Sequence, residues 1–151
     1  MAFYTASYMA QNYGREPRKI VVAGRQAPNE VNLTEFKSYM DDDALIKELI
    51  RYQATPKEIL QNQELLSFVL PEVRRDYKLN ESFIYRGECI NSPLILHSGV
   101  NDIEANKEIM QRWSSVTKKV VRMREFQSDH FFVLNLGNEY WEQLYRDLLE
   151  E

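Results

Sequence analysis

An apolar run, IVVAG at residues 20–24, constrains the fold more than any other stretch of this chain. It is rich in β-branched residues and does not alternate with polar ones, which is typical of a strand covered on both faces of a parallel sheet. Residues 2–13 predict a helix buried on most sides, ending at Gly14. A helix that leads into a buried strand indicates an α/β fold.

Two further strands are predicted downstream. The second covers residues 93–98 and is closed by Gly99, and the third covers residues 119–123. Helices are expected at residues 104–113 and, with one apolar face, at residues 139–149. Because a helix or loop follows each strand, the pattern favours a parallel sheet of about three strands with flanking helices.

The interval between the first two strands reads as mostly helical. Residues 41–52, 55–61 and 63–77 have helical patterns, whereas residues 25–40 show no clear period. So long a helical excursion between two strands predicts an insertion, such as a lid, over residues 38–80.

Composition argues against several classes of function. The 151 residues predict one domain, and the 19 basic and 23 acidic residues include only short basic pairs, which does not favour nucleic-acid binding. Cys89 is the single cysteine, which suits a reducing compartment, and no Cys or His spacing suits a metal. The apolar first segment lacks a basic leader and is too short to span a bilayer. We therefore expect a cytoplasmic protein without cofactor, metal or membrane partner.

Asp102 and His130 are the candidate site residues, because each follows a predicted strand. Ligands and catalytic groups gather at the carboxyl ends of parallel strands. The two positions lie 28 residues apart, one helix plus one strand, so adjacent strands would bring them to the same edge. There a carboxylate can hold an imidazole in the tautomer that general-base chemistry needs. Two alternatives stay open: Asp102 could cap the next helix, and His130 could be a packed residue beside Phe131.

No nucleophile is evident, since the sequence contains no G-x-S-x-G motif. The pair Ser98-Gly99 is the nearest echo of it. Cys89 precedes the second strand, on the side opposite the candidate site, and is interpreted as an inert thiol. His97 lies within that strand and is interpreted as a packed or edge residue.

Six short segments follow one another in a specific order along nearly the whole chain. They are AGRQAP at 23–28, TPKEIL at 55–60, LPEVRRDY at 70–77, YR at 85–86, GVND at 99–102 and HFF at 130–132.

Together these segments resemble the C-terminal portion of type II thioesterases, the α/β-hydrolases that serve nonribosomal peptide and polyketide synthases. The first is similar to the S-G-R-x-A-P loop of that family, the next two to its lid, and the fourth to the Y-R before the next strand. The last two are similar to the turns that carry the triad acid and the triad base.

The resemblance implies that Asp102 orients His130, and that His130 activates a serine. It also implies that the lid controls access of an acyl chain held on a phosphopantetheine arm, so that an acyl or peptidyl carrier protein is the expected partner. The chain departs from the family pattern at three positions. Ser128 and Asp129 replace the two glycines before the histidine, and Ile103 replaces the proline after the acid.

The start of the chain, MAFY, resembles the helix that follows the nucleophile elbow, which would place the serine roughly five residues before Met1. The resemblance thus implies a partial α/β-hydrolase domain over residues 1–151, without the half that carries the serine. Its uncovered sheet edge favours association with a complementary N-terminal half or with itself. The alternative is a non-catalytic interaction module that binds a carrier protein or another synthase component.

Overall fold

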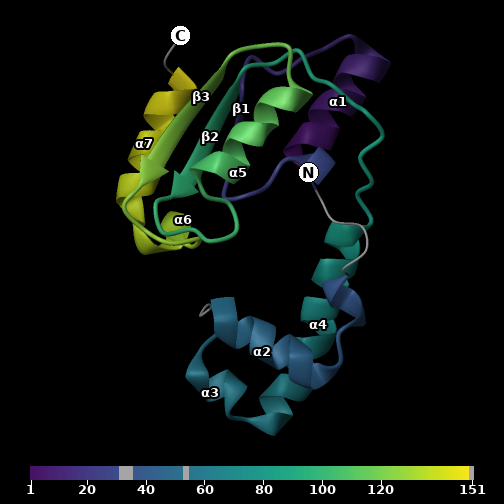
Figure 1. Cartoon of the computed structure of the whole chain (residues 1–151), viewed down its shortest axis with the longest axis vertical. Helices are drawn as coiled ribbons and strands as arrows, with labels where there is room; N and C mark the ends of the chain where they lie inside the picture. Colours follow the sequence, from purple (N-terminus) through teal and green to yellow (C-terminus); the bar gives the residue numbers. More distant parts are fainter. Residues whose placement is uncertain (31–35, 53–54, 150–151) are drawn as a thin grey trace. The chain divides into compact units, whose positions relative to one another are not determined.

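The computed structural model of the chain describes residues 1–30, 36–52 and 55–149 (Figure 1). These residues form two compact units. The sheet unit consists of residues 1–30 and 85–149, and the helical unit consists of residues 36–52 and 55–84.

Three parallel strands form the centre of the sheet unit, as predicted. They are β1 (Ile20–Ala23), β2 (Leu94–Gly99) and β3 (Val121–Phe126), in the order β1-β2-β3. Ala23 lies opposite His97, and Gly99 lies opposite Phe126. This register brings the carboxyl ends of all three strands to one edge of the sheet, where the loops carrying the candidate site residues begin.

Helices cover both faces of the sheet (Figure 1). One face is covered by α1 (Ala2–Tyr13) and α5 (Lys107–Gln111), which continues as the 3-10 helix η3 (Arg112–Val116), and the other by α7 (Asn138–Leu149). Buried apolar side chains fill the space beneath α1, α5 and η3: Phe3, Ala6, Ile20, Leu94, Leu96, Met110, Trp113 and Val116. The sheet is therefore the middle of three layers.

The third strand and the helix before it differ from their predicted ranges. The strand covers Val121–Phe126 rather than 119–123, because pairing with β2 continues through Phe126. The helix predicted at 104–113 is α5, which begins only at Lys107, since the backbone of residues 102–105 is held in the loop of Asp102. Asn106 caps α5 by accepting a hydrogen bond from the Ile109 N–H at 3.1 Å.

Two other features were not predicted correctly. The helix α1 was expected to be buried on most sides, but within the described residues its buried side chains are Phe3, Ala6 and Ser7, whereas Tyr8 is 57% exposed. The short helix α6 (Phe132–Asn135) was not predicted, because four residues are too few to show a helical period.

The helical unit contains α2 (Asp42–Tyr52), α3 (Lys57–Leu60) and α4 (Gln63–Glu81), close to the three predicted helices. The aperiodic range 25–40 contains two 3-10 helices, η1 (Pro28–Glu30) in the sheet unit and η2 (Lys37–Tyr39) in the helical unit. Residues 31–35 of that range, residues 53 and 54 of the predicted insertion, and residues 150 and 151 lie outside the described residues. The compact unit contains the rest of the predicted insertion, and its role as a lid stays a prediction.

Charged side chains hold the helical unit together. The Arg74 guanidinium on α4 donates hydrogen bonds to the carbonyl oxygens of Ser38 and Met40 and pairs with Asp42. Arg51 and Lys37 both pair with Glu48, and the Arg51 hydrogen bond, followed by that of Lys37, lowers the pKa of the Glu48 carboxyl to about 2. Arg74, part of the LPEVRRDY segment, therefore ties α4 to the chain that enters α2.

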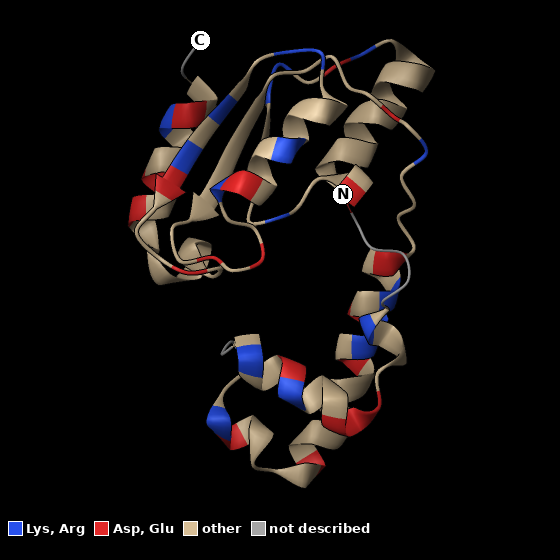
Figure 2. Cartoon of the chain, in the orientation of Figure 1, with Lys and Arg blue, Asp and Glu red and all other residues tan. Residues whose placement is uncertain are grey.

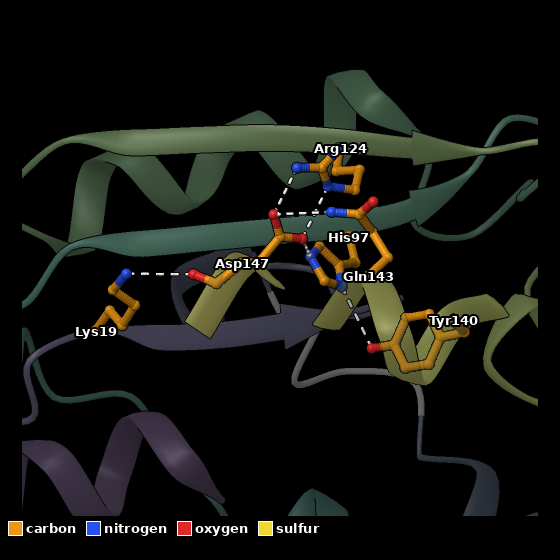
Figure 3. A network of polar contacts seen from close by, with 6 residues as sticks. All are labelled: Lys19, His97, Arg124, Tyr140, Gln143 and Asp147. Carbon is orange, nitrogen blue, oxygen red and sulfur yellow. Dashed lines mark hydrogen bonds and ion pairs between the residues drawn. The ribbon is translucent and has the colours of Figure 1, made fainter. Parts of the chain in front are cut away.

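In the sheet unit, a buried polar network fixes α7 to the face of the sheet opposite α1 and α5 (Figure 3). The Asp147 carboxylate on α7 accepts hydrogen bonds from His97 Nε2 at 3.0 Å, from Arg124 Nε at 2.8 Å and from Gln143 Nε2 at 3.2 Å. Because a carboxylate only accepts, His97 Nε2 carries the hydrogen, and the Tyr140 hydroxyl donates to His97 Nδ1 at 3.3 Å. His97 is thus a packed residue, as interpreted from the sequence.

Burial and charge act differently on the two titrating groups of this network. Burial lowers the pKa of the His97 imidazole, and this effect exceeds the attraction of Asp147. Burial alone would raise the pKa of the Asp147 carboxyl, but the hydrogen bond and charge of Arg124, together with the hydrogen bond of His97, outweigh it and bring the pKa below its usual value. The network is therefore held as a neutral imidazole against an ionised carboxylate.

Replacing Asp147 with alanine should lower the free energy of unfolding by about 3 kcal/mol, because it leaves the hydrogen-bonding groups of His97 and Arg124 without their common acceptor. Urea denaturation measures the change. The control is Glu142→Gln, which breaks an exposed ion pair with Arg146 at 3.7 Å and should cost less than about 1 kcal/mol. Equal effects of the two substitutions would contradict a stabilising role of the network.

Stability should fall as the pH drops below about 6.5, the usual pKa of histidine. The folded chain holds His97 with a lowered pKa, so in this range the unfolded chain binds a proton that the folded chain does not. His97→Gln should flatten the loss of stability between about pH 7.5 and about pH 5.5, whereas His130→Gln should leave that contribution in place. Denaturation curves at several pH values test this, and an unchanged slope in His97→Gln would refute it.

Candidate active site

The Asp102 side chain is buried in the loop that follows β2. Its Oδ1 atom accepts hydrogen bonds from the backbone N–H groups of Glu104 and Ala105, both at 2.9 Å. Asp102 therefore does not cap α5, which was the alternative left open by the sequence; Asn106 does that. Oδ1 is engaged by the loop, and Oδ2 is turned to His130.

His130 lies in the turn between β3 and α6 and meets Asp102 directly. Its Nδ1 atom is 2.8 Å from Asp102 Oδ2. Because the carboxylate only accepts, Nδ1 donates the hydrogen, and Nε2 is the basic nitrogen of the neutral ring. The Asp102 side chain has no exposed surface, while the His130 side chain is 30% exposed. The pair thus has a buried acid and an accessible base.

The end of β1 lies beside this pair. A Cβ atom added at Gly24 would lie 3.6 Å from His130 Cε1, 3.7 Å from Asp102 Oδ2 and 3.5 Å from Phe132 Cε1. Gly24 has φ of +56°, a conformation that residues with a side chain rarely adopt. These separations are ordinary van der Waals distances, so the imidazole lies beside the end of the first strand, and all three strands contribute to the site.

A close approach between two loops sets the separation of Asp102 and His130. A Cβ atom added at Gly99 would lie 2.6 Å from the carbonyl oxygen of Ser128 and closer still to that of Asp129. The same loops are joined by hydrogen bonds from Asn101 N–H to Ser128 O at 3.0 Å and from Val100 N–H to Phe126 O at 2.8 Å. Only glycine at position 99 permits this contact.

The sequence identified Asp102 and His130 but missed the roles of Gly24 and Gly99 in the geometry. The available signal was the position of the two glycines: Gly24 directly follows the first strand, and Gly99 ends the second. A glycine at such a position often marks a close approach of another backbone. At the third departure from the family pattern, Ile103 is 72% exposed, and the Asp102 loop closes without a proline.

The other residues considered from the sequence lie elsewhere. Ser98 Oγ is buried and has no hydrogen-bond partner among the described residues. Cys89 is exposed and lies before β2, at the far end of that strand from Asp102. Within the described ranges no group of three or more His, Cys, Asp or Glu side chains could hold a metal ion.

Charge is distributed unevenly between the two edges of the sheet (Figure 2). The loops at the carboxyl ends of the strands carry acidic side chains, including Asp102 and Asp129. At the amino ends of the strands lies a cavity of about 440 Å³, and its lining includes Arg18, Lys19 and Arg122. This cavity is therefore separate from the candidate active site.

A buried carboxylate bonded to an accessible imidazole can act as a general base toward a hydroxyl or thiol. The nucleophile itself would have to approach Nε2. The 151 residues contain no G-x-S-x-G motif that would present a serine on a strand-to-helix turn.

Comparisons with known proteins agree with this geometry. The family model described as "Thioesterase domain" matches residues 1–149. Thioesterase PikA5 of Streptomyces venezuelae is 30% identical over 98% of this chain and 51% of its own length. Gramicidin S biosynthesis protein GrsT of Aneurinibacillus migulanus is 27% identical over 98% of this chain and 58% of its own length. The chain thus spans about half the length of the curated relatives it matches.

Solved structures share the fold. YbtT, a type II thioesterase from a yersiniabactin NRPS/PKS biosynthetic pathway, superposes with a TM-score of 0.81 at 28% identity. The match covers 96% of this chain and 59% of YbtT. These findings confirm the predicted α/β-hydrolase sheet and the resemblance to type II thioesterases. No helix in the described part of the chain is both long and apolar enough to cross a membrane.

Gly99→Ala should lower the free energy of unfolding by about 2 to 3 kcal/mol, because the added methyl group meets backbone oxygens that cannot rotate away. Gly24→Ala is the matched comparison. It should cost only about 1 kcal/mol, since its contacts are ordinary and only the positive φ is strained. Urea denaturation of both variants tests the ranking, and a smaller loss for Gly99→Ala would contradict the close approach.

Proposed function

Because the chain belongs to the thioesterase family, we propose that Asp102 and His130 are the acid and the base of a serine-dependent acyl-thioester hydrolase. The observation that carries the proposal is the 2.8 Å hydrogen bond from His130 Nδ1 to the buried Asp102 carboxylate. It lies at the carboxyl edge of the sheet, where α/β enzymes place their reacting groups.

The geometry supports a two-step reaction. His130 Nε2 takes the proton of a serine hydroxyl as its oxygen attacks the thioester carbonyl, and Asp102 stabilises the imidazolium that forms. The imidazolium then gives its proton to the departing thiolate, which leaves an acyl-serine and a free thiol. In the second step His130 removes a proton from water, whose oxygen attacks the acyl-serine. The imidazolium returns this proton to the serine oxygen as the acyl–oxygen bond breaks, so that the carboxylic acid leaves and the serine hydroxyl is restored.

The serine is proposed to come from a segment outside the given sequence, either upstream on the same polypeptide or on a separate one. β1 is an edge strand of the described sheet, paired only with β2. Gly24 follows the carboxyl end of β1, and His130 lies beside it. A strand added beside β1 would therefore bring a strand-end serine toward the imidazole, and it would also cover an edge that is open to association.

The proposed substrate is an acyl group on the phosphopantetheine arm of an acyl or peptidyl carrier protein. The proposal follows from the family and from relatives named for gramicidin S and yersiniabactin biosynthesis. The helical unit is proposed to be the lid over the acyl chain. On α4 it exposes Leu65 and Phe68, the kind of apolar surface that contacts an acyl chain.

A second candidate function is a non-catalytic module that binds a carrier protein or another synthase component. One observation favours it: Ser128 and Asp129 replace the glycines of the family's histidine turn. In this case the open edge of β1 would pair with another protein or a second copy of the chain.

The decisive experiment mixes this chain with a polypeptide that supplies a strand with G-x-S-x-G, and follows hydrolysis of an acyl-carrier thioester. Only the mixture should release the acid. His130→Ala and Asp102→Asn should each lower kcat by about 10⁴-fold, because both remove the oriented base. The exposed Cys89→Ser is the control and should leave kcat unchanged.

A serine-reactive phosphonate adds an independent readout. It should label the companion polypeptide and not this chain. Labelling of this chain alone, or full turnover with His130→Ala, would refute the enzymatic proposal. Tight binding of the carrier without any hydrolysis in the mixture would favour the interaction module.

A further inference from the structure

The turn that carries His130 holds its shape without the two glycines of the family pattern. Its backbone is fixed on one side by Gly99, which the carbonyl oxygens of Ser128 and Asp129 approach closely. On the other side the Asp129 carbonyl accepts the Phe132 N–H at 3.2 Å. Backbone contacts alone thus hold the two residues before His130, without any contribution from their side chains.

The side chains that replace the glycines form a second set of contacts. Asp129 Oδ1 accepts the backbone N–H of Phe131 at 2.8 Å, a bond that spans His130 from one side to the other. Asn135, the last residue of α6, donates its Nδ2 hydrogens to Asp129 Oδ1 at 2.9 Å and to Ser128 Oγ at 3.3 Å. These hydrogen-bonded side chains link the residues on the two sides of His130. We call them the brace: Ser128, Asp129 and Asn135.

We propose that Asp129, held by Asn135, is a positioning residue that orients the His130 imidazole toward Asp102. A bond from an Asp side chain to the N–H two residues later restricts the backbone of the residue between them. That residue here is His130, whose Nδ1 must stay 2.8 Å from Asp102 Oδ2. The brace thus adds a side-chain hydrogen bond across His130 to the backbone contacts that already hold the turn.

The restraint matters because His130 has solvent on one side. Its side chain is 30% exposed, and its bond to Asp102 Oδ2 depends on where the backbone of the turn places the ring. A hydrogen bond across His130 restricts its backbone, and so reduces the backbone freedom that would move the ring away from Asp102. The consequence for catalysis rests on the function proposed above, whereas the structural effect on the pair does not.

Nuclear magnetic resonance of histidine-labelled protein tests the brace without any assay of activity. The chain has two histidines, so the ring signals of His130 and of the buried His97 are easily separated. In the unaltered chain the Nδ1 hydrogen of His130 should give a resolved signal that exchanges slowly with water. In Asp129→Ala it should be lost or exchange at least about 10-fold faster, because the ring leaves Asp102 more often.

Asp129→Asn is the conservative variant. The amide oxygen can still accept the Phe131 N–H, so the His130 signal should be retained although the charge is gone. Asp43→Ala, at an exposed position in the helical unit, is the matched control and should leave both histidine signals unchanged. A role of Asp129 through its charge alone would instead make Asn behave like Ala.

Two outcomes would overturn the proposal: a His130 signal in Asp129→Ala equal to that of the unaltered chain, or equal loss in Asp129→Asn and Asp129→Ala. If Asp129→Ala also loses the His97 signal and has therefore unfolded, Asn135→Ala decides by the same readout. That variant keeps the bond across His130 and removes only its support, so exchange of the Nδ1 hydrogen should be intermediate.

In the reconstituted hydrolase, Asp129→Ala should lower kcat by about 10-fold with KM unchanged, since it misplaces the base and does not touch the acyl chain. Asp129→Asn should restore kcat. A rise in KM with unchanged kcat would overturn the positioning role. Absence of hydrolysis in every variant would count against the proposed function alone, because the resonance experiment is independent of it.

Discussion

The backbone contact between Gly99 and the turn at Ser128 and Asp129 is the constraint on which the candidate site depends. It joins the end of β2 to the loop that leaves β3 at a separation that only a residue without a side chain allows. Asp102 lies three residues beyond Gly99, and His130 follows Asp129 directly. The approach of the two backbones thereby fixes the separation of the two side chains. The sheet register places Gly99 opposite Phe126, so the loops that follow β2 and β3 begin side by side and meet at this contact.

The other side of the site is supported from α7. Phe132 is fully buried, stacks on Phe126 with 5.2 Å between ring centres, and lies against the position of Gly24. Tyr140 of α7 packs on both phenylalanines and donates to His97. The buried network of Asp147 is thus joined by direct contacts to Phe126 and Phe132, which come before and after His130 in the chain. Burying the Asp147 carboxylate costs free energy, which its hydrogen bonds to His97 and Arg124 offset in part. These bonds also hold α7 on the sheet, so that Tyr140 stays packed against the two phenylalanines.

Much of this arrangement could be predicted from the sequence, and the parts that could not have physical reasons. Parallel strands with a regular crossover bring residues after each strand to one edge, so the spacing of Asp102 and His130 predicted their meeting. The end of β3 was missed because two charged residues, Arg124 and Glu125, follow Met123, while the pairing with β2 continues through them to Phe126. The partner of His97 was not predictable, since Asp147 lies 50 residues away on a helix whose rotation about its axis no local pattern determines.

Asp129 shows why a departure from a family pattern is weak grounds for inferring a lost site. Glycine is used in such turns because it permits close approach and unusual dihedral angles. In this chain the closest approach is made by Gly99, on the opposite loop, so the turn itself can carry side chains. Once they are present, Ser128 and Asp129 bind Asn135 and the backbone after His130, and the imidazole still meets its carboxylate at 2.8 Å. The close contact between the two loops needs a glycine only at position 99. The facing loop can therefore carry side chains, and those of Ser128 and Asp129 form hydrogen bonds.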